Sequence, residues 1–152
     1  MSRAFINEDA FVNALPDRPV SEHPNLVTER GHALIERALE AARAAYGEAQ
    51  AAGDREALAS AGRDLRYWKA RRATAQLRVP TSDADVVQFG HAVAIEREDG
   101  RRQTFRIVGE DEADPAQGSI SYVSPLARAL IGKRIGDTVG AGKDEAEITG
   151  IA

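Results

Sequence analysis

The chain has 152 residues, of which 20 are Lys or Arg and 24 are Asp or Glu, so its formal net charge is −4. It has no cysteine, which excludes disulfides and thiolate chemistry, and its three histidines lie too far apart for metal-ligand spacing. No apolar run approaches the roughly 20 residues of a membrane span, and the N-terminus lacks an apolar signal core. We therefore expect a cytoplasmic protein with no metal site of its own and no membrane contact.

The first part of the chain, residues 1–27, contains Pro16, Pro19 and Pro24 and shows no sustained hydrophobic period. This composition predicts an extended or partly disordered arm. Several apolar side chains could dock the arm onto another surface: Phe5, Phe11, Val12 and Leu15.

Residues 28–78 predict an antiparallel helical hairpin. In the first helix, which Thr28 can cap, apolar residues alternate at spacings of four and three along one seam: Ile35, Leu39, Ala42, Tyr46 and Ala49. Gly53-Asp54 interrupts the pattern, and the second helix is expected from about Arg55 to Leu77. At a rise of 1.5 Å per residue, arms of about 22 residues would reach about 33 Å.

The hairpin is the basic part of the chain. Residues 28–78 contain 10 Lys or Arg against 7 Asp or Glu, whereas residues 79–152 contain 8 against 13. The chain is therefore not basic enough throughout for a general nucleic-acid coat, but a local basic face could contact phosphate. The candidates lie on the second helix: Arg63, Arg66, Lys69, Arg71 and Arg72. A solvated helix face, balanced by acids on the first helix, explains the same pattern equally well.

Two aromatic residues, Tyr67 and Trp68, lie among these basic residues. They could stack on bases, although a large aromatic residue at seam spacing is more often part of a core.

Residues 79–85 are predicted to be a linker and residues 86–152 a small α+β domain. Alternating apolar residues predict strands at about 88–99, 103–108, 119–123 and 144–151, with a further short strand after the Gly136-Asp137 turn. Ser124-Pro125 is typical of the cap and first residue of a helix, here expected over 125–131.

The C-terminal part, from about residue 86 to 151, resembles the C-terminal domain of the bacterial Gre transcript-cleavage and elongation factors. The resemblance is carried by matched positions in order along the chain: Val108-Gly109, Asp111-Glu112-Ala113-Asp114, Ser124-Pro125, Leu126-Ala127-Arg128-Ala129-Leu130, Gly132-Lys133 and Gly136-Asp137. It implies an FKBP-like domain, with a small antiparallel sheet around a short helix, that follows a coiled-coil hairpin.

The resemblance also implies a partner, RNA polymerase, which such factors bind at the rim of the secondary channel. The polymerase contact is expected at the following residues: Ser124, Pro125, Leu126, Ala127 and Arg128, with Asp111 and Glu112 in an acidic rim. Helix capping, core packing and an ordinary solvated turn are the alternative explanations. The family uses a basic patch on its hairpin to meet the 3′ end of the nascent RNA, which implies this role for Arg63, Arg66 and Lys69.

At the hairpin tip, Gre factors carry acids that help hold the second catalytic Mg²⁺ of polymerase. By resemblance, this protein would be no enzyme itself and would have no cofactor of its own, but would lend Asp54 and Glu56 to the polymerase. The family pattern is Gly-Asp, two residues, then Glu-Asn. Here Ala57 and Leu58 take the last two places, and Glu56 comes one position early, about 100° around the helix. Capping by Asp54 and a favourable first-turn charge at Glu56 are the structural alternatives.

Two mechanisms remain open within the family: stimulation of transcript cleavage in backtracked complexes, or occupancy of the channel by a regulator that lacks a full acid pair. The altered tip and arms that look shorter than those of the family favour the second, whereas the family resemblance itself favours the first. Prolyl isomerase activity is disfavoured, because from residue 86 onward the only aromatic residues are Phe89, Phe105 and Tyr122. Some short-hairpin relatives are named nucleoside diphosphate kinase regulators, so an adaptor is a further alternative. No small-molecule substrate is expected.

Overall fold

The computed structural model describes residues 15–152, which form two compact units. The described part of the first unit comprises residues 15–22 and Ala33–Ala75. The second unit comprises His23–His32 and Gln76–Ala152. Among the described residues, no helix is long and apolar enough to cross a lipid bilayer.

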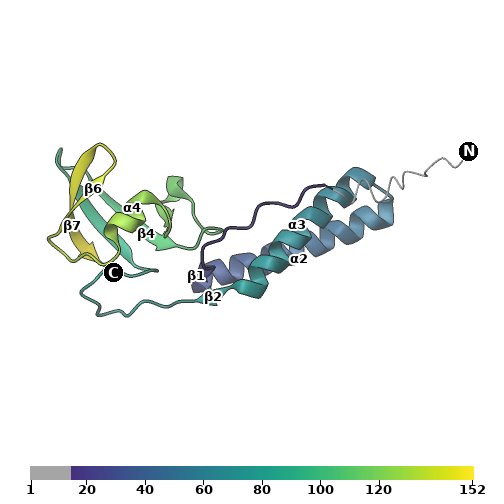
Figure 1. Cartoon of the computed structure of the whole chain (residues 1–152), viewed down its shortest axis with the longest axis horizontal. Coiled ribbons are helices and arrows are strands. Elements are labelled where there is room, and N and C mark those ends of the chain that lie inside the picture. Colours follow the sequence, from purple (N-terminus) through teal and green to yellow (C-terminus); the bar gives the residue numbers. More distant parts are fainter. Residues whose placement is uncertain (1–14) are drawn as a thin grey trace, which may run out of the picture. The chain divides into compact units, whose positions relative to one another are not determined.

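Two long helices form the hairpin: α2, Glu29–Ala52, and α3, Arg55–Thr74 (Figure 1). Gly53 makes the turn between them with a φ of +64°, a conformation that a residue without a side chain adopts freely. The predicted seam of α2 is largely confirmed, since four of its five residues are buried: Ile35, Leu39, Ala42 and Ala49. The helices approach closely at Gly62, where an added Cβ would lie 3.5 Å from the ring of Tyr46.

The prediction that the second helix continues to about Leu77 is wrong. It ends at Thr74, because Gln76–Leu77 forms strand β2 and pairs in parallel with β1, Leu26–Val27. Two-residue strands have no hydrophobic period, so the sequence pattern could not reveal this pairing.

Residues 15–22, which we call the strap, run along α3 without helix or strand structure (Figure 1). The predicted arm, extended or partly disordered over residues 1–27, has no helix or strand in this part. Leu15 is 39% exposed, and its carbonyl oxygen accepts a hydrogen bond from Arg66 Nη2 at 3.5 Å. The other predicted docking residues, Phe5, Phe11 and Val12, lie outside the described residues.

The second unit is built on a five-stranded sheet with the strand order β5-β4-β3-β7-β6. Its strands are β3 (Ala92–Arg97), β4 (Arg102–Val108), β5 (Ser119–Ser121), β6 (Thr138–Ala141) and β7 (Asp144–Ile151). Neighbouring strands are antiparallel except β4 and β5. That pair departs from the predicted antiparallel sheet, because the chain passes through the acidic turn and the short 3₁₀-helix Pro115–Gln117 before it re-enters the sheet.

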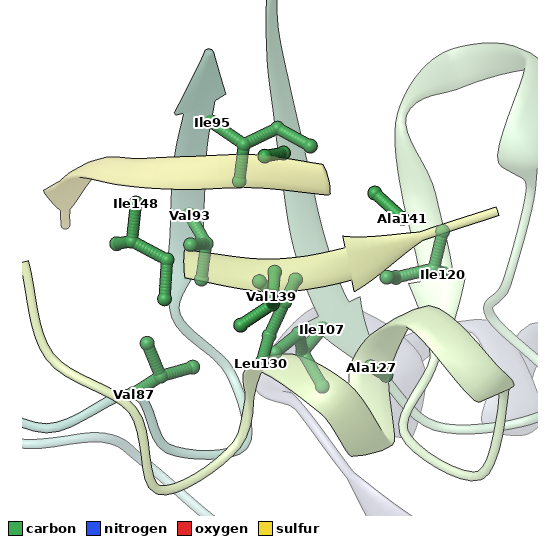
Figure 2. Close-up of a cluster of buried hydrophobic side chains, with 11 residues drawn as sticks. Val87, Val93, Ile95, Ile107, Ile120, Ala127, Leu130, Val139, Ala141 and Ile148 are labelled. Carbon is green, nitrogen blue, oxygen red and sulfur yellow. The ribbon is translucent and has the colours of Figure 1, made fainter. Parts of the chain in front are cut away.

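One short helix, α4 (Pro125–Leu130), packs on this sheet and confirms the predicted α+β class. Figure 2 shows Ala127 and Leu130 of α4 among the buried side chains of the strands. The core consists of eleven residues: Val87, Val93, Ile95, Ile107, Ile120, Ala127, Leu130, Val139, Ala141, Ala146 and Ile148. The sequence pattern assigns Phe89 to one strand face with Val93 and Ile95, but β3 begins only at Ala92. Phe89 lies in the preceding turn and packs against this core from a partly buried position.

The linker is held by a buried histidine. His91 is 2% exposed, and its Nδ1 accepts a hydrogen bond from the backbone N–H of Gln88 at 2.9 Å. Its other ring nitrogen, Nε2, therefore carries the hydrogen and donates to the carbonyl oxygen of Thr81 at 3.0 Å. His91 thus has a structural role.

Candidate functional site

The hairpin tip presents two exposed carboxylates, Asp54 and Glu56. Asp54 caps α3, since its Oδ1 accepts a hydrogen bond from the backbone N–H of Ala57 at 3.1 Å. Its other carboxylate oxygen, Oδ2, accepts no hydrogen bond from the described residues. Glu56 lies in the first turn of α3, where a negative charge is favourable. Asp54 therefore has a capping role and still has one oxygen free for another ligand.

Below the tip, α2 and α3 line a groove of about 440 Å³. Its walls are mostly alanine, and its carboxylates come from Glu48, Asp54 and Asp64. Within residues 15–152, no three acidic or histidine side chains are arranged to hold a metal ion. A cation bound by Asp54 would therefore need further ligands from another molecule.

The three basic residues predicted to contact RNA have different surroundings. Arg66 Nε donates to Asp17 Oδ1 of the strap at 2.6 Å. Arg63 Nε lies 3.8 Å from Asp64 Oδ1. Lys69 is exposed and lines a second groove, of about 330 Å³, together with Leu39, Arg43, Arg72 and Ala73. Lys69 therefore lines this second groove, whereas Arg66 contacts the strap.

The strap also covers the aromatic pair of α3. The rings of Tyr67 and Trp68 meet edge to face, with their centroids 4.9 Å apart. The guanidinium carbon of Arg18 lies 3.9 Å from the Tyr67 ring centroid and 5.5 Å from that of Trp68. Arg18 Nη1 also pairs with Asp64 Oδ1 at 3.2 Å. No sequence pattern indicates these contacts, because nothing local sets the register of the strap against α3.

Sequence reasoning also missed a buried arginine on α3. The charge pattern places Arg71 with the exposed basic residues, whereas it is 2% exposed and makes a polar interaction. Arg72 stays exposed and pairs through Nε with Glu36 Oε1 at 2.8 Å. A helical charge pattern alone cannot distinguish these adjacent positions when the helix is covered on more than one side.

In the C-terminal domain, the predicted polymerase-binding residues lie at the start of α4. Ser124 caps the helix, because its Oγ accepts a hydrogen bond from the backbone N–H of Ala127 at 3.3 Å. Ala127 is fully buried in the core, and Leu126 is partly buried against it. Pro125 and Arg128 are exposed. Of the five residues, Pro125 and Arg128 therefore offer the most surface to a partner.

The acidic turn is connected to the start of α2. Thr28 caps α2, as predicted, by accepting a hydrogen bond from the backbone N–H of Gly31 at 3.0 Å. The same hydroxyl donates to Glu112 Oε2. The carboxylate of Glu112 thus lies at the positive end of a helix, where it is favoured electrostatically. Asp111, the other predicted rim residue, is partly buried and also makes a polar interaction.

Near this point, the second unit contains a cavity of about 340 Å³. Its charged side chains have both signs: Arg30, Arg78 and Arg106 against Glu29 and Glu112. Two of the arginines already donate to carbonyl oxygens, Arg106 to Gly90 at 2.9 Å and Arg78 to Leu77 at 3.5 Å. Two of the three arginines that line this cavity therefore already have hydrogen-bond partners within the protein.

Comparison with known proteins gives matches in the C-terminal part of the chain, where the motifs from Val108 to Asp137 lie. Residues 81–150 match the family model described as "Transcription elongation factor, GreA/GreB, C-term". A curated relative, transcription elongation factor GreB of Neisseria meningitidis serogroup B, is 51% identical over 71 residues, which are 44% of this chain and 44% of the relative. Transcription elongation factor GreA of Desulfovibrio desulfuricans is 39% identical over 108 residues, which are 67% of this chain and 65% of the relative.

The chain therefore spans less than two thirds of the length of these relatives. Among solved structures, GreA factor homolog 1 (Gfh1) of Thermus thermophilus aligns over 86% of this chain and 99% of its own, with 21% identity and a TM-score of 0.43. The family model and the curated relatives show that residues 81–150 form a C-terminal domain of the kind found in the GreA/GreB transcription elongation factors.

Proposed function

We propose that this protein binds RNA polymerase at the rim of the secondary channel through its C-terminal domain and regulates elongation with its helical hairpin. The observation that carries the proposal is the family match over residues 81–150, in a chain that also has a hairpin with the exposed acid Asp54 at its tip. In this role the protein is no enzyme, because the reacting atoms belong to the polymerase and its transcript. It works in the cytoplasm, beside the polymerase.

The exposed side of α4 supports the docking role. Pro125 and Arg128 are exposed there, and Ile131 and Ile135, just beyond the helix, are 38% and 61% exposed. Apolar side chains flanked by the exposed cations Arg128, Lys133 and Arg134 suit the side of a partner helix. Ser124 fixes the start of α4 by capping it, and the buried Ala127 supports it from the core.

The tip supports a contribution of Asp54 to chemistry in the polymerase. Its free oxygen fits a share in a polymerase-bound Mg²⁺, because Mg²⁺ prefers carboxylate oxygens and accepts ligands from several partners. Such an ion, when bound, polarises the phosphate and activates water. Ala57 and Leu58 stand where the family pattern has Glu-Asn, so Glu56 is the available second acid. This change favours the second mechanism, occupancy of the channel without a full acid pair.

RNA cleavage in stalled, backtracked elongation complexes tests the proposal, with a Gre factor of known activity as competitor. The informative variants are Asp54→Asn and Asp54→Ala, because asparagine caps a helix about as well as aspartate but carries no charge. If the wild type shortens the transcript, Asp54→Asn should abolish cleavage while the hairpin stays folded. If the wild type only blocks the competitor, the protein is a channel-occupying regulator and both variants should still block it.

Docking is tested separately by capture of core polymerase. Arg128→Glu should weaken capture, whereas Arg102→Glu should not, since Arg102 lies on β4 with its side chain 81% exposed. A wild-type protein that neither binds core polymerase nor competes with the other factor would overturn the proposal.

A further inference from the structure

The surface of α3 beneath the strap has the chemistry of a single-stranded RNA site. Arg66 offers a guanidinium for a phosphate, and Tyr67 and Trp68 offer aromatic rings for a base. Proteins that bind single strands combine such basic and stacking groups. In this structure, the strap covers both kinds of group.

The phosphate position is taken by a carboxylate. Asp17 Oδ1 accepts a hydrogen bond from Nε–H of Arg66 at 2.6 Å. The carbonyl oxygen of Leu15 accepts a second one from Nη2 of the same guanidinium at 3.5 Å. An RNA phosphate could not use Nε of Arg66 while Asp17 is in place.

The base position is taken by a planar cation. The guanidinium of Arg18 lies over the Tyr67 ring at 3.9 Å, within stacking distance, and Asp64 holds it there through an ion pair of 3.2 Å. Pro16 and Pro19 flank the Asp17-Arg18 pair, and a following proline biases Arg18 toward an extended backbone. The strap therefore presents a carboxylate and a planar group side by side, as a nucleotide presents a phosphate and a base.

We propose that the strap is an intramolecular competitor of single-stranded RNA, so that this face of α3 binds RNA only when the strap leaves it. The proposal rests on the proposed function, because a hairpin that occupies the secondary channel of polymerase lies beside the transcript. The strap is suited to leave, because its ion pairs are partly exposed and each such pair contributes little: the side chains of Arg18 and Asp64 are each 37% exposed, and those of Arg66 and Asp17 are 43% and 70% exposed.

The test is the affinity of the full-length protein for a fluorescein-labelled oligouridylate at low salt, measured by fluorescence anisotropy. Arg18→Ala removes a positive charge, so charge alone predicts weaker binding. Loss of the competing stack predicts RNA binding about two- to fivefold tighter, the factor that one exposed cation–π contact represents. Asp17→Asn should also tighten binding. Its matched control is Glu22→Gln, which makes the same charge change in the strap at a residue without these contacts.

A second set of measurements localises the effect. The chain has a single tryptophan, so its emission reports on Trp68, and Arg18→Ala should change that emission without RNA. Adding Arg66→Ala to Arg18→Ala should remove the gain in RNA affinity.

The outcomes separate this inference from the proposed function. Tighter binding by Arg18→Ala, reversed by Arg66→Ala, supports the competitor. Unchanged or weaker binding by Arg18→Ala, unchanged Trp68 emission, or no RNA binding by any form overturns it. None of these results alters the capture of core polymerase through α4, which alone decides whether the docking proposal stands.

Discussion

Asp54, Ser124 and Glu112 are residues for which the sequence offers both a structural and a functional explanation. In the structure each carboxylate or hydroxyl accepts a hydrogen bond that supports a helix start: Asp54 in α3, Ser124 in α4 and Glu112, through Thr28, in α2. Alanine at any of them would remove the cap or its support together with any contact to a partner. Isosteric substitutions are therefore required to separate the two roles.

Asp99, at the turn between β3 and β4, gives a prediction for a single ionisable group. Its Oδ1 accepts a hydrogen bond from the backbone N–H of Arg101 at 2.9 Å, and its Oδ2 accepts one from Nε of the same arginine at 2.5 Å. The backbone hydrogen bond, aided by the guanidinium, holds the pKa of Asp99 below its usual value. Because the folded pKa is lowered, the small stabilisation is present above the unfolded pKa and is lost as pH falls through the folded pKa.

An NMR titration of the Asp99 carboxyl carbon checks this direction. The pKa should lie below that of Asp in an unstructured peptide of the same sequence. Arg101→Ala should raise the pKa only part of the way, because the backbone N–H remains. Equal values in protein and peptide would contradict the assignment.

At the scale of elements, α2 and α3 follow from amphipathic periodicity, and their glycines differ in what surrounds them. Gly47 of α2 has open space where a Cβ would stand. Gly31, in the first turn of the same helix, would place a Cβ 2.7 Å from Oε2 of Glu112. Helix propensity alone treats both positions alike.

We expect Gly47→Ala to raise the free energy of unfolding by about 1 kcal/mol, because alanine loses less backbone entropy in a helix. Gly31→Ala should give a smaller gain or none, since its methyl group displaces the Glu112 carboxylate from Thr28. Urea unfolding followed by far-ultraviolet circular dichroism compares the two variants. Equal stabilisation by both would show that the bond between Thr28 and Glu112 contributes nothing measurable.

At the scale of the whole molecule, residues far apart in the sequence complete the second unit. Segment 23–32 is joined to the rest of the second unit by the pairing of β1 with β2 and by a hydrogen bond from the Tyr122 hydroxyl to the Pro24 carbonyl oxygen. Gly109 allows this approach, because an added Cβ would lie only 2.3 Å from the carbonyl oxygen of Leu26. The Val108-Gly109 motif thus has a steric explanation.

Gly109→Ala should therefore lower the free energy of unfolding by at least about 2 kcal/mol, as expected when a side chain is forced against backbone. Gly140→Ala is the matched control, because a Cβ added at this position in β6 would have no atom within 4 Å. Hydrogen exchange supplies the second readout, since the amides of Gln76 and Arg78 donate to the carbonyl oxygens of Asn25 and Val27 and should lose protection in Gly109→Ala if β1 leaves β2. A stability equal to that of Gly140→Ala would contradict the close approach.

The sequence by itself determined the two long helices, the main elements of the C-terminal domain and the family resemblance of that domain. Periods of 3.6 and 2 residues are local properties, so they located the seam of α2, the strands and α4 to within a few residues, and the order of motifs from Val108 to Asp137 identified the C-terminal domain. The capping roles of Thr28, Asp54 and Ser124 were also readable, because a cap lies next to its own helix.

Only the tertiary structure decided which polar groups meet. Arg18 pairs with Asp64 across 46 residues and Thr28 with Glu112 across 84, and strands β1 and β2 pair although each has two residues. A sequence shows that such groups are charged or polar, but each pair contributes only about 1 kcal/mol and many other pairs would serve as well. The path of the whole chain selects among them, and for this reason the contacts of the strap could be found only in the folded molecule.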